Sequence, residues 1–200
     1  PSIKFISSKE QIDNIDFDYQ LPIGSLPRLF RNNEIDFQKS RVGYLKADQN
    51  YVNHLKKKLN LANRPLVGLS WASFDCLTSD KKSIELNRLR EALNSFGCDV
   101  INLQYGNVKR DVEEFSNNIN FKFINDHGID VYDDIEGLAA LIEICDLVVT
   151  IPNITIQLTG ALGKEGWVLL PFSPNYPWTD YRKTSLWYKN IDIFRQKKIN

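Results

Sequence analysis

The sequence predicts an α/β protein built on a parallel β-sheet. From residue 65 onward, short apolar runs rich in β-branched residues alternate with stretches whose apolar residues follow helical spacing. Of the 200 residues, 42% are hydrophobic and 12% aromatic, which is enough to bury the core of one large domain or of two small ones. We therefore expect a soluble globular chain with helices on both faces of the sheet.

The predicted strands and helices follow one another through residues 65–170. N-cap residues open the helices, and glycine closes two of them. The expected strands are residues 66–71, 99–103, 121–124, 146–151 and 167–170. The expected helices are residues 83–96, capped by Ser83 and closed by Gly97, and residues 153–162, closed by Gly163. A third helix is expected at residues 135–145, capped by Asp133 or Asp134 with a capping-box-like contact from Glu136. Residues 109–118 form a short polar helix or a loop.

Residues 1–62 have a different character. They contain one early strand candidate at residues 3–7, a loop punctuated by proline at residues 18–30, and an amphipathic helix at residues 48–59. These elements are too few for an independent core, so we expect them to pack on the larger unit. The sequence thus suggests that residues 1–62 are the tail of an amino-terminal domain with a linker helix, followed by one domain over residues 63–200.

Charge and hydropathy argue against a nucleic-acid partner and against a membrane span. The 25 basic and 25 acidic side chains cancel, and the lysines form scattered short clusters. No apolar stretch reaches the roughly 18 to 20 residues that a membrane-spanning helix needs. The amino-terminal residues also lack the pattern of a signal peptide.

The cysteines and histidines indicate neither a disulfide framework nor a metal site. Cys76, Cys98 and Cys145 are odd in number and far apart, which favours reduced packing thiols and a cytoplasmic location. His54 and His127 lack metal-ligand spacing, so we expect no metal and no tightly bound cofactor. The chain begins with Pro and contains no Met, from which we expect it to be part of a longer protein.

The stretch TIPNIT, residues 150–155, is the strongest candidate for a binding site. Ligands of open parallel sheets bind beyond the carboxyl ends of the strands, where a helix amino terminus offers amide groups to an anion. Pro152 keeps the preceding residue extended and Asn153 is a favoured N-cap. The amides of residues 154–156 and the Thr155 hydroxyl could then hold a phosphate, and Gly160 would let the helix approach the sheet or a ligand closely. The alternative is that Asn153 is a helix cap and nothing more.

Several motifs together resemble a known family. The stretches VGLSW, KKSIEL, INLQYG, DLVVTI with LTGALGK, WVLLPF and SLWYKNIDIFRQ are similar to the carboxyl half of bacterial glycosyltransferases of the heptosyltransferase-like and tetratricopeptide-linked type. The resemblance spans most of the chain, and FDYQLPIGSLPRLF is similar to the stretch that joins the two domains of such proteins. It implies the Rossmann-like carboxyl domain of a GT-B fold, which binds a nucleotide-diphospho-sugar donor.

The same resemblance implies what this chain lacks. In that family the amino domain supplies most of the site for the sugar or protein acceptor. Only the tail of that domain would be present here, so the catalytic base expected from it has no candidate, and we expect the chain alone to be inactive.

The resemblance also assigns roles to individual residues. Ser70 and Trp71 would lie near the donor's phosphates, and Lys82 would be the cation that neutralises the leaving diphosphate. Gln104 and Tyr105 would lie near the nucleotide base. The alternatives are that Lys82 is a solvated residue beside a helix cap, and that Gln104 and Tyr105 belong to a plain loop beside a strand end.

The sequence departs from the family at the anion site. Asn153, Thr155 and Gly160 match the family's pattern, but Pro152 replaces an acidic residue and Gln157 replaces a histidine. Gln157 can donate a hydrogen bond to phosphate but carries no charge, so we expect weaker or different donor binding. The competing hypothesis is a non-catalytic binding or scaffold module on the same fold, with a degenerate donor site.

The aromatic segment after the last predicted strand offers two further candidates. Trp178 and Arg182 could contact a sugar or the acceptor, because aromatic faces and guanidinium groups stack on such ligands. We expect Trp187 and Phe194 instead to pack, as part of a strap that wraps the domain.

Overall fold

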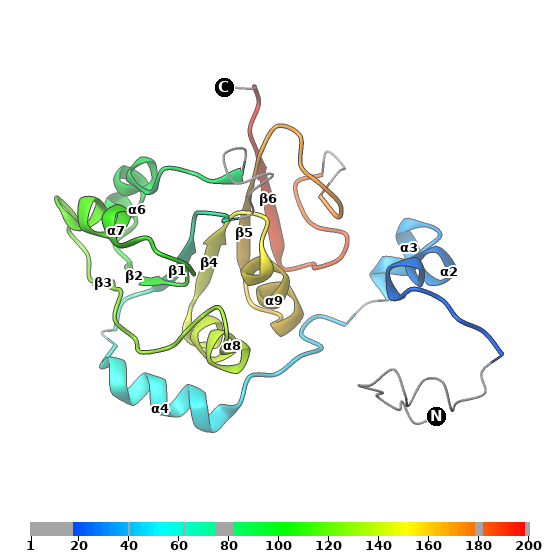
Figure 1. The fold of residues 1–200 in the computed structure, drawn as a ribbon, viewed down its shortest axis with the longest axis horizontal. Coiled ribbons are helices and arrows are strands. Elements are labelled where there is room, and N and C mark those ends of the chain that lie inside the picture. The colour runs from blue at the N-terminus through cyan, green and yellow to red at the C-terminus, as the bar shows by residue number, and fades with distance from the viewer. Residues whose placement is uncertain (1–17, 40, 62, 75–81, 179–181, 199–200) are drawn as a thin grey trace. The chain divides into compact units, whose positions relative to one another are not determined.

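The computed structural model describes five stretches of the chain, namely residues 18–39, 41–61, 63–74, 82–178 and 182–198 (Figure 1). The chain divides into two compact units, Pro1–Lys39 and Ser40–Asn200. The early strand candidate at residues 3–7 lies outside the described residues. The sequence suggested a division between residues 62 and 63, and the difference is due to the helix α4 (Gln49–Leu59), which buries Val52, Leu55 and Leu59 in the core of the second unit.

Short helices make up much of the described part of the first unit. They are η1 (Ile23–Ser25), α2 (Pro27–Phe30) and α3 (Glu34–Gln38), the first two in a stretch expected to be a loop. Asn33 and Asp36 form a capping box at the start of α3, with the Asp36 amide 3.2 Å from Asn33 Oδ1. None of the residues in these three helices is buried, so local hydrogen bonds rather than a core define this segment.

The second unit is built on a six-stranded sheet in the order β3-β2-β1-β4-β5-β6, in which every neighbouring pair is parallel. This confirms the predicted fold class. The strand order reverses between β1 and β4, which makes that junction the topological switch point of the sheet. The strands are β1 (Leu66–Ser70), β2 (Asp99–Asn102), β3 (Phe123–Ile124), β4 (Leu147–Thr150), β5 (Gly166–Leu170) and β6 (Ile191–Arg195).

Helices cover both faces of the sheet (Figure 1). Alternate residues of a strand point to opposite faces, and β1 shows this: Leu66 packs with α4, α8 and α9, whereas Val67 and Leu69 pack with η2, α6 and α7. The sheet therefore lies between two separate hydrophobic clusters. Besides α4, the helices with described bounds in this unit are η2 (Leu86–Leu89), α6 (Arg90–Phe96), α7 (Lys109–Ser116), α8 (Ile135–Ile144) and α9 (Ile154–Leu162).

Two helix starts differ from the sequence predictions. The predicted helix after Ser83 begins only at residue 86, as a 3-10 turn, because the Ser83 hydroxyl accepts a hydrogen bond from the Ser73 amide at 3.0 Å instead of capping a helix. Asp134 caps α8 as predicted, but its carboxylate accepts from Gly137 N. With Asp134 as the cap, the third helical residue is Gly137 and Glu136 is the second. A capping box needs an acidic or amide side chain at the third position, so the contact predicted for Glu136 does not form.

The strand β6 was not predicted. Its alternation of buried Ile191 and Ile193 with exposed residues marks a strand with one face in the core, but five residues give a weak pattern. The preceding segment also runs antiparallel beside it: Ile193 N donates to Lys183 O at 2.7 Å and Ser185 N to Ile191 O at 2.9 Å. We call residues 171–178 and 182–190 the strap. Its residues 183–185 lie along β6 and so protect this edge of the sheet from pairing with other chains.

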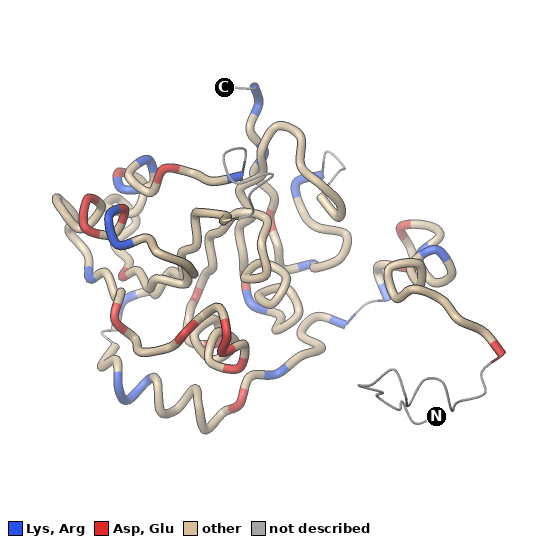
Figure 2. The backbone as a smooth tube through the Cα atoms, viewed as in Figure 1, with Lys and Arg blue, Asp and Glu red and all other residues tan. Residues whose placement is uncertain are grey.

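Charges of both signs are scattered over the second unit, as Figure 2 shows, which agrees with the balanced composition. Among the described residues, no helix has the length and apolar character that crossing a bilayer requires. Cys98 and Cys145 are free and buried thiols, as predicted for packing residues. Burial raises the pKa of Cys98, and it raises the pKa of Cys145 to about 12.

Candidate functional site

Two clefts open at the carboxyl ends of the strands. The larger has a volume of about 1170 Å³ and lies between Trp71 after β1 and Arg195 at the end of β6. The smaller, of about 600 Å³, lies between the start of α9 and the first part of the strap. Lys82 and Pro171 line both clefts, so the two adjoin. Their position agrees with the rule that open α/β sheets bind ligands at this edge.

A chain of hydrogen bonds crosses the switch point between β1 and β4. Asn153 Nδ2 donates to Ser70 Oγ at 2.9 Å, and the Ser70 hydroxyl donates to Gln104 Oε1 at 3.0 Å. Thr150, the last residue of β4, donates from its hydroxyl to Asn153 Oδ1 at 3.2 Å. Ser70, Gln104 and Thr150 are all at most 5% exposed, so the folded chain buries a satisfied polar network where the sequence predicted a site.

Asn153 is the N-cap of α9, as predicted. Its Oδ1 accepts from the amides of Thr155 at 3.1 Å and Ile156 at 3.4 Å. Two of the three amides that the sequence suggested for holding a phosphate therefore already have a partner. Gln157, one turn into the helix, lines the smaller cleft and is half-buried.

Hydrogen bonds hold the two residues that follow Lys82 against the loop after β1. Ile84 N donates to Trp71 O at 2.9 Å, and Ser73 N donates to the Ser83 hydroxyl at 3.0 Å. The loop after β1 is thus bonded to the residues that directly follow Lys82. Among the described residues that line the smaller cleft, Lys82 carries the one formal charge, which suits an anionic group there.

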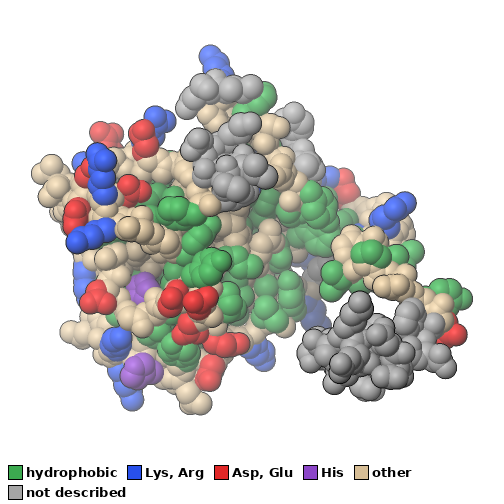
Figure 3. All heavy atoms as spheres, in the orientation of Figure 1, with side chains coloured by type: hydrophobic (Ala, Val, Ile, Leu, Met, Phe, Trp, Pro, Cys, Tyr) green, Lys and Arg blue, Asp and Glu red, His purple; other side chains and the backbone are tan. Residues whose placement is uncertain are grey.

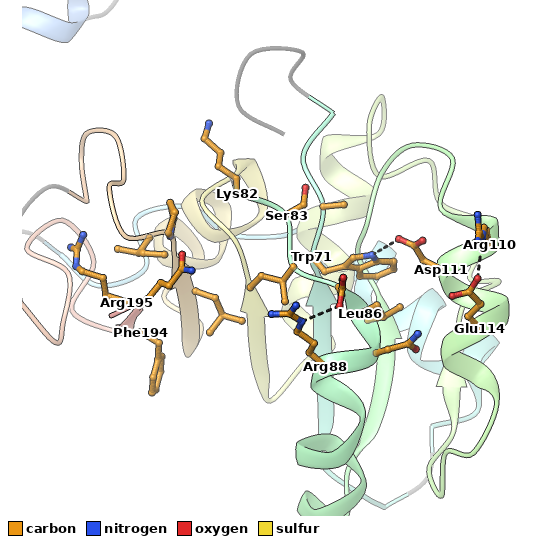
Figure 4. Close-up of a pocket in the computed structure, with 18 residues that line it drawn as sticks. Trp71, Lys82, Ser83, Leu86, Arg88, Arg110, Asp111, Glu114, Phe194 and Arg195 are labelled. Carbon is orange, nitrogen blue, oxygen red and sulfur yellow. Dashed lines mark hydrogen bonds and ion pairs between the residues drawn. The ribbon is translucent and has the colours of Figure 1, made fainter. Parts of the chain in front are cut away.

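Trp71 forms the middle of the larger cleft (Figure 4). It is only 1% exposed, and its indole Nε1 donates to Asp111 Oδ2 at 3.1 Å. Figure 4 shows Arg110 and Glu114 on one side of this tryptophan and Arg195 on the other. Because the indole is buried and bonded, Trp71 acts as a wall of the cleft, and any group placed there meets the charged side chains around it.

Three aromatic rings gather where the chain leaves β2. The Phe74 and Tyr105 ring centroids are 5.6 Å apart, and those of Tyr105 and Tyr132 are 5.8 Å apart. Phe74 is 51% and Tyr132 69% exposed. In the view of Figure 3, hydrophobic side chains gather over the region of α8 and α9. Gly106 is required beside them, because it has φ +84° and a Cβ there would lie 2.5 Å from the Phe74 ring.

Sequence reasoning identified Tyr105 in this cluster but missed Phe74 and Tyr132. These two residues are 58 positions apart in the chain, and no short motif contains both.

The remaining predicted residues lie outside this arrangement or serve the core. A Cβ on Gly160 would overlap Tyr188, so this glycine admits the strap rather than a ligand. Trp178 lines the smaller cleft but is 2% exposed and packs with Ile156 and Ile191. Arg182 is half-buried and is not among the described residues that line the two clefts.

The expected packing residues also differ from one another. Phe194 packs against Trp167 with the two rings tilted by 54° and their centroids 5.2 Å apart, yet it remains 47% exposed and lines the larger cleft. Trp187 is half-buried beside Tyr176, with centroids 6.0 Å apart. Phe194 thus lines the larger cleft from β6, whereas Trp187 packs within the strap.

Comparison with known proteins identifies the fold. No protein-family model matches this sequence. The chain is 32% identical over 177 residues to Protein FlbA of Caulobacter vibrioides, which covers 84% of this chain and 30% of FlbA. The structure is similar to the glycosyl transferase family 9 protein of Veillonella parvula, with TM-score 0.60 and 14% identity over 78% of this chain and 44% of that one. It is also similar to the E. coli ADP-heptose LPS heptosyltransferase II, with TM-score 0.55 and 14% identity over 76% and 45% of the two chains.

These likenesses confirm a Rossmann-like α/β fold of the kind found in glycosyltransferases. The chain spans less than a third of FlbA and less than half of either solved structure. What the longer proteins do as a whole therefore enters only as a proposal.

Proposed function

We propose that this chain contains the nucleotide-diphospho-sugar-binding domain of a glycosyltransferase that transfers a sugar to an acceptor. The observation that carries the proposal is the coincidence of three features at one place. The switch point between β1 and β4, the capped start of α9 and Lys82 all lie beside the two clefts. A diphosphate beside them would meet a lysine and a helix amino terminus, which favour negative charge.

The aromatic cluster gives this proposal a second part. Phe74 and Tyr132 are exposed rings on either side of the half-buried Tyr105, which follows the end of β2. Stacking on aromatic rings is a common way to hold a nucleobase. We therefore propose that the base stacks on this cluster while the diphosphate lies towards Lys82.

The buried network favours a second candidate, a binding or scaffold module without transferase activity. The Gln104 carboxamide and two amides of α9 are engaged within the protein. Pro152 and Gln157 also replace the charged residues of the resembled family. A module of this kind would keep the fold but would hold no donor.

Calorimetric titration separates these candidates. The 200-residue chain is titrated with UDP, GDP, ADP and inorganic pyrophosphate. Lys82→Gln is expected to weaken every one of these ligands by roughly tenfold, because each presents a diphosphate to the lost charge. Tyr132→Ala is expected to weaken the nucleotides and to leave pyrophosphate unchanged, because only the base would touch that ring.

Lys57→Gln is the matched control, since Lys57 is an exposed lysine on α4 and lines neither cleft. It should leave all affinities unchanged. If none of the four ligands binds at millimolar concentration, the donor-site proposal fails and the scaffold module takes its place.

A further inference from the structure

Gln104 is buried and fully engaged at the carboxyl end of β2. It is 5% exposed, and its side-chain oxygen accepts hydrogen bonds from Ser70 Oγ at 3.0 Å, Trp71 N at 2.8 Å and Ala72 N at 2.7 Å. Its Nε2 donates to Ala72 O at 3.0 Å and Tyr105 O at 2.8 Å. Both amide hydrogens and the oxygen of the carboxamide are therefore used, and none is left for a ligand.

We propose that Gln104 is a positioning residue, which sets the loop after β1 and through that loop the place of Lys82, without touching the bound molecule. The proposal rests on the proposed function, because it concerns how the same site is assembled. It replaces the direct contact with the base that the sequence suggested for this residue.

The path from Gln104 to Lys82 is a short series of hydrogen bonds. The carboxamide accepts from the amides of Trp71 and Ala72 and donates to the carbonyl of Ala72. In the same loop, the Trp71 carbonyl accepts a hydrogen bond from Ile84 N, and the Ser73 amide donates one to the Ser83 hydroxyl. Since Lys82 directly precedes Ser83, the backbone that carries the lysine is held by the loop that Gln104 shapes.

A second branch reaches the helix α9. The Ser70 hydroxyl, 1% exposed, links Gln104 Oε1 to Asn153 Nδ2. The residue that shapes the loop after β1 is therefore also bonded, through one hydroxyl, to the cap of the helix beside the smaller cleft. Glutamine suits this position because one oxygen and one NH2 group serve donors and acceptors at once.

Two variants that remove different hydrogen bonds of Gln104 test this role. Gln104→Met keeps the approximate volume but removes every hydrogen bond, which leaves the buried Trp71 amide without its acceptor. Gln104→Glu keeps the acceptor oxygen and replaces the NH2 group by a second oxygen that faces the Ala72 and Tyr105 carbonyls. We expect about tenfold weaker nucleotide binding for Gln104→Met and at least as large a loss for Gln104→Glu, because its second oxygen would face two buried carbonyl oxygens without a donor.

The decisive measurement is a double-mutant cycle with Lys82→Ala, in which calorimetry gives the affinity for the nucleoside diphosphate that binds best. If Gln104 acts through Lys82, Gln104→Met should have little further effect once Lys82 is replaced. Affinity losses that simply multiply would overturn the proposal. Thr159→Val is the control: it removes a buried hydroxyl that donates to Thr155 O at 2.7 Å, and it should leave the affinity unchanged.

A readout without nucleotide keeps this proposal separate from the proposed function. Amide hydrogen exchange at Trp71 and Ala72, followed by NMR, should be slow in the wild-type chain and at least about tenfold faster in Gln104→Met. If no nucleotide binds but exchange responds in this way, the proposed function fails and the structural role of Gln104 remains. Unchanged exchange at both amides would overturn the role of Gln104, whatever binds.

Discussion

The helices α8 and α9 are built alike but start with different chemistry. Each buries seven residues, and each has a side-chain N-cap. Asp134 caps α8 with a carboxylate, which also accepts the Tyr51 hydroxyl at 2.7 Å. Asn153 caps α9 with an uncharged amide beside the smaller cleft. The comparison teaches that burial decides where a helix packs, whereas the charge of its cap decides which ligands its start can accept.

The hydrogen bond to Asp134 raises the pKa of Tyr51, which keeps that hydroxyl protonated as a donor. The start of α8 thus carries a negative charge that is already bonded within the protein. A phosphate would be repelled there. At the start of α9 the same dipole has no acidic cap, which is the physical basis for placing the anion at that helix.

The largest expected effect concerns the glycine inside each helix. A Cβ on Gly160 of α9 would overlap the Tyr188 ring and lie 2.8 Å from Tyr188 Cβ, whereas a Cβ on Gly137 of α8 would meet its own cap Asp134 and lie 2.6 Å from Ile129 Cγ2. We expect Gly160→Ala and Gly137→Ala each to lower the free energy of unfolding by about 1 to 3 kcal/mol, despite the gain in helix propensity. Urea unfolding measures both.

A double-mutant cycle with Tyr188→Ala distinguishes the two glycines. In that background Gly160→Ala should cost at least about 1 kcal/mol less, because the overlapping ring is gone, and the cost of Gly137→Ala should not change. Equal costs of Gly160→Ala in both backgrounds would show that the strap is not the obstacle.

The next effect comes from exchanging the charges of the two caps. Asn153→Asp keeps the side-chain acceptor for α9 but places a negative charge beside the smaller cleft, so nucleoside diphosphate binding should weaken by about tenfold or more. It also loses the Nδ2 donor to Ser70 Oγ, so stability should fall by about 1 kcal/mol. Asp134→Asn should leave binding unchanged and lower stability by up to about 1 kcal/mol. Calorimetry and urea unfolding on both variants check this, and equal affinities for Asn153→Asp and wild type would place the anion elsewhere.

A smaller, pH-dependent effect separates the other ends of the helices. Cys145 ends α8, and burial raises the pKa of its thiol from 9.0 to about 12, whereas Gly163, which ends α9, does not titrate. A raised pKa means that the folded chain keeps a proton that the unfolded chain loses, so this contribution is complete below pH 9 and is lost as the pH rises towards 12. At pH 10 the loss is about 1.4 kcal/mol.

Urea unfolding at pH 8 and pH 10 measures this contribution. Cys145→Ala should be less stable than wild type at pH 8 because it leaves a small cavity, but its decline between the two pH values should be smaller by about 1.4 kcal/mol. Cys98, Tyr51 and Tyr188, whose pKa values are also raised in the folded chain, contribute to the decline that persists in the variant. An unchanged decline would mean that the Cys145 thiol already ionises in the folded chain.

The elements with strong local signals were predictable, and those held by distant partners were not. The two residues predicted to bound α9 were correct: Asn153 is the N-cap at which the helix begins, and Gly163 is the left-handed residue at which it ends. Ser83 was wrongly expected to cap a helix, since its hydroxyl bonds to Ser73, ten residues earlier. The strand β6 was missed, because pairing with β5 and the strap, rather than its own five residues, stabilises it.

For the candidate site, the sequence determined which chemistry is present and the tertiary structure decided what each group does. Strand and helix periodicity, caps and the apolar content were enough to specify a parallel α/β sheet and to point to Asn153 at its carboxyl edge. The resemblance to a glycosyltransferase family added Ser70 and Lys82. Only the folded chain decided that Gln104 is internally bonded, that Gly160 faces Tyr188, and that distant aromatic residues meet beside β2. The physical reason is that propensity and capping act over a few neighbouring residues, whereas the partners of a buried polar group are set by where the sheet brings remote segments together.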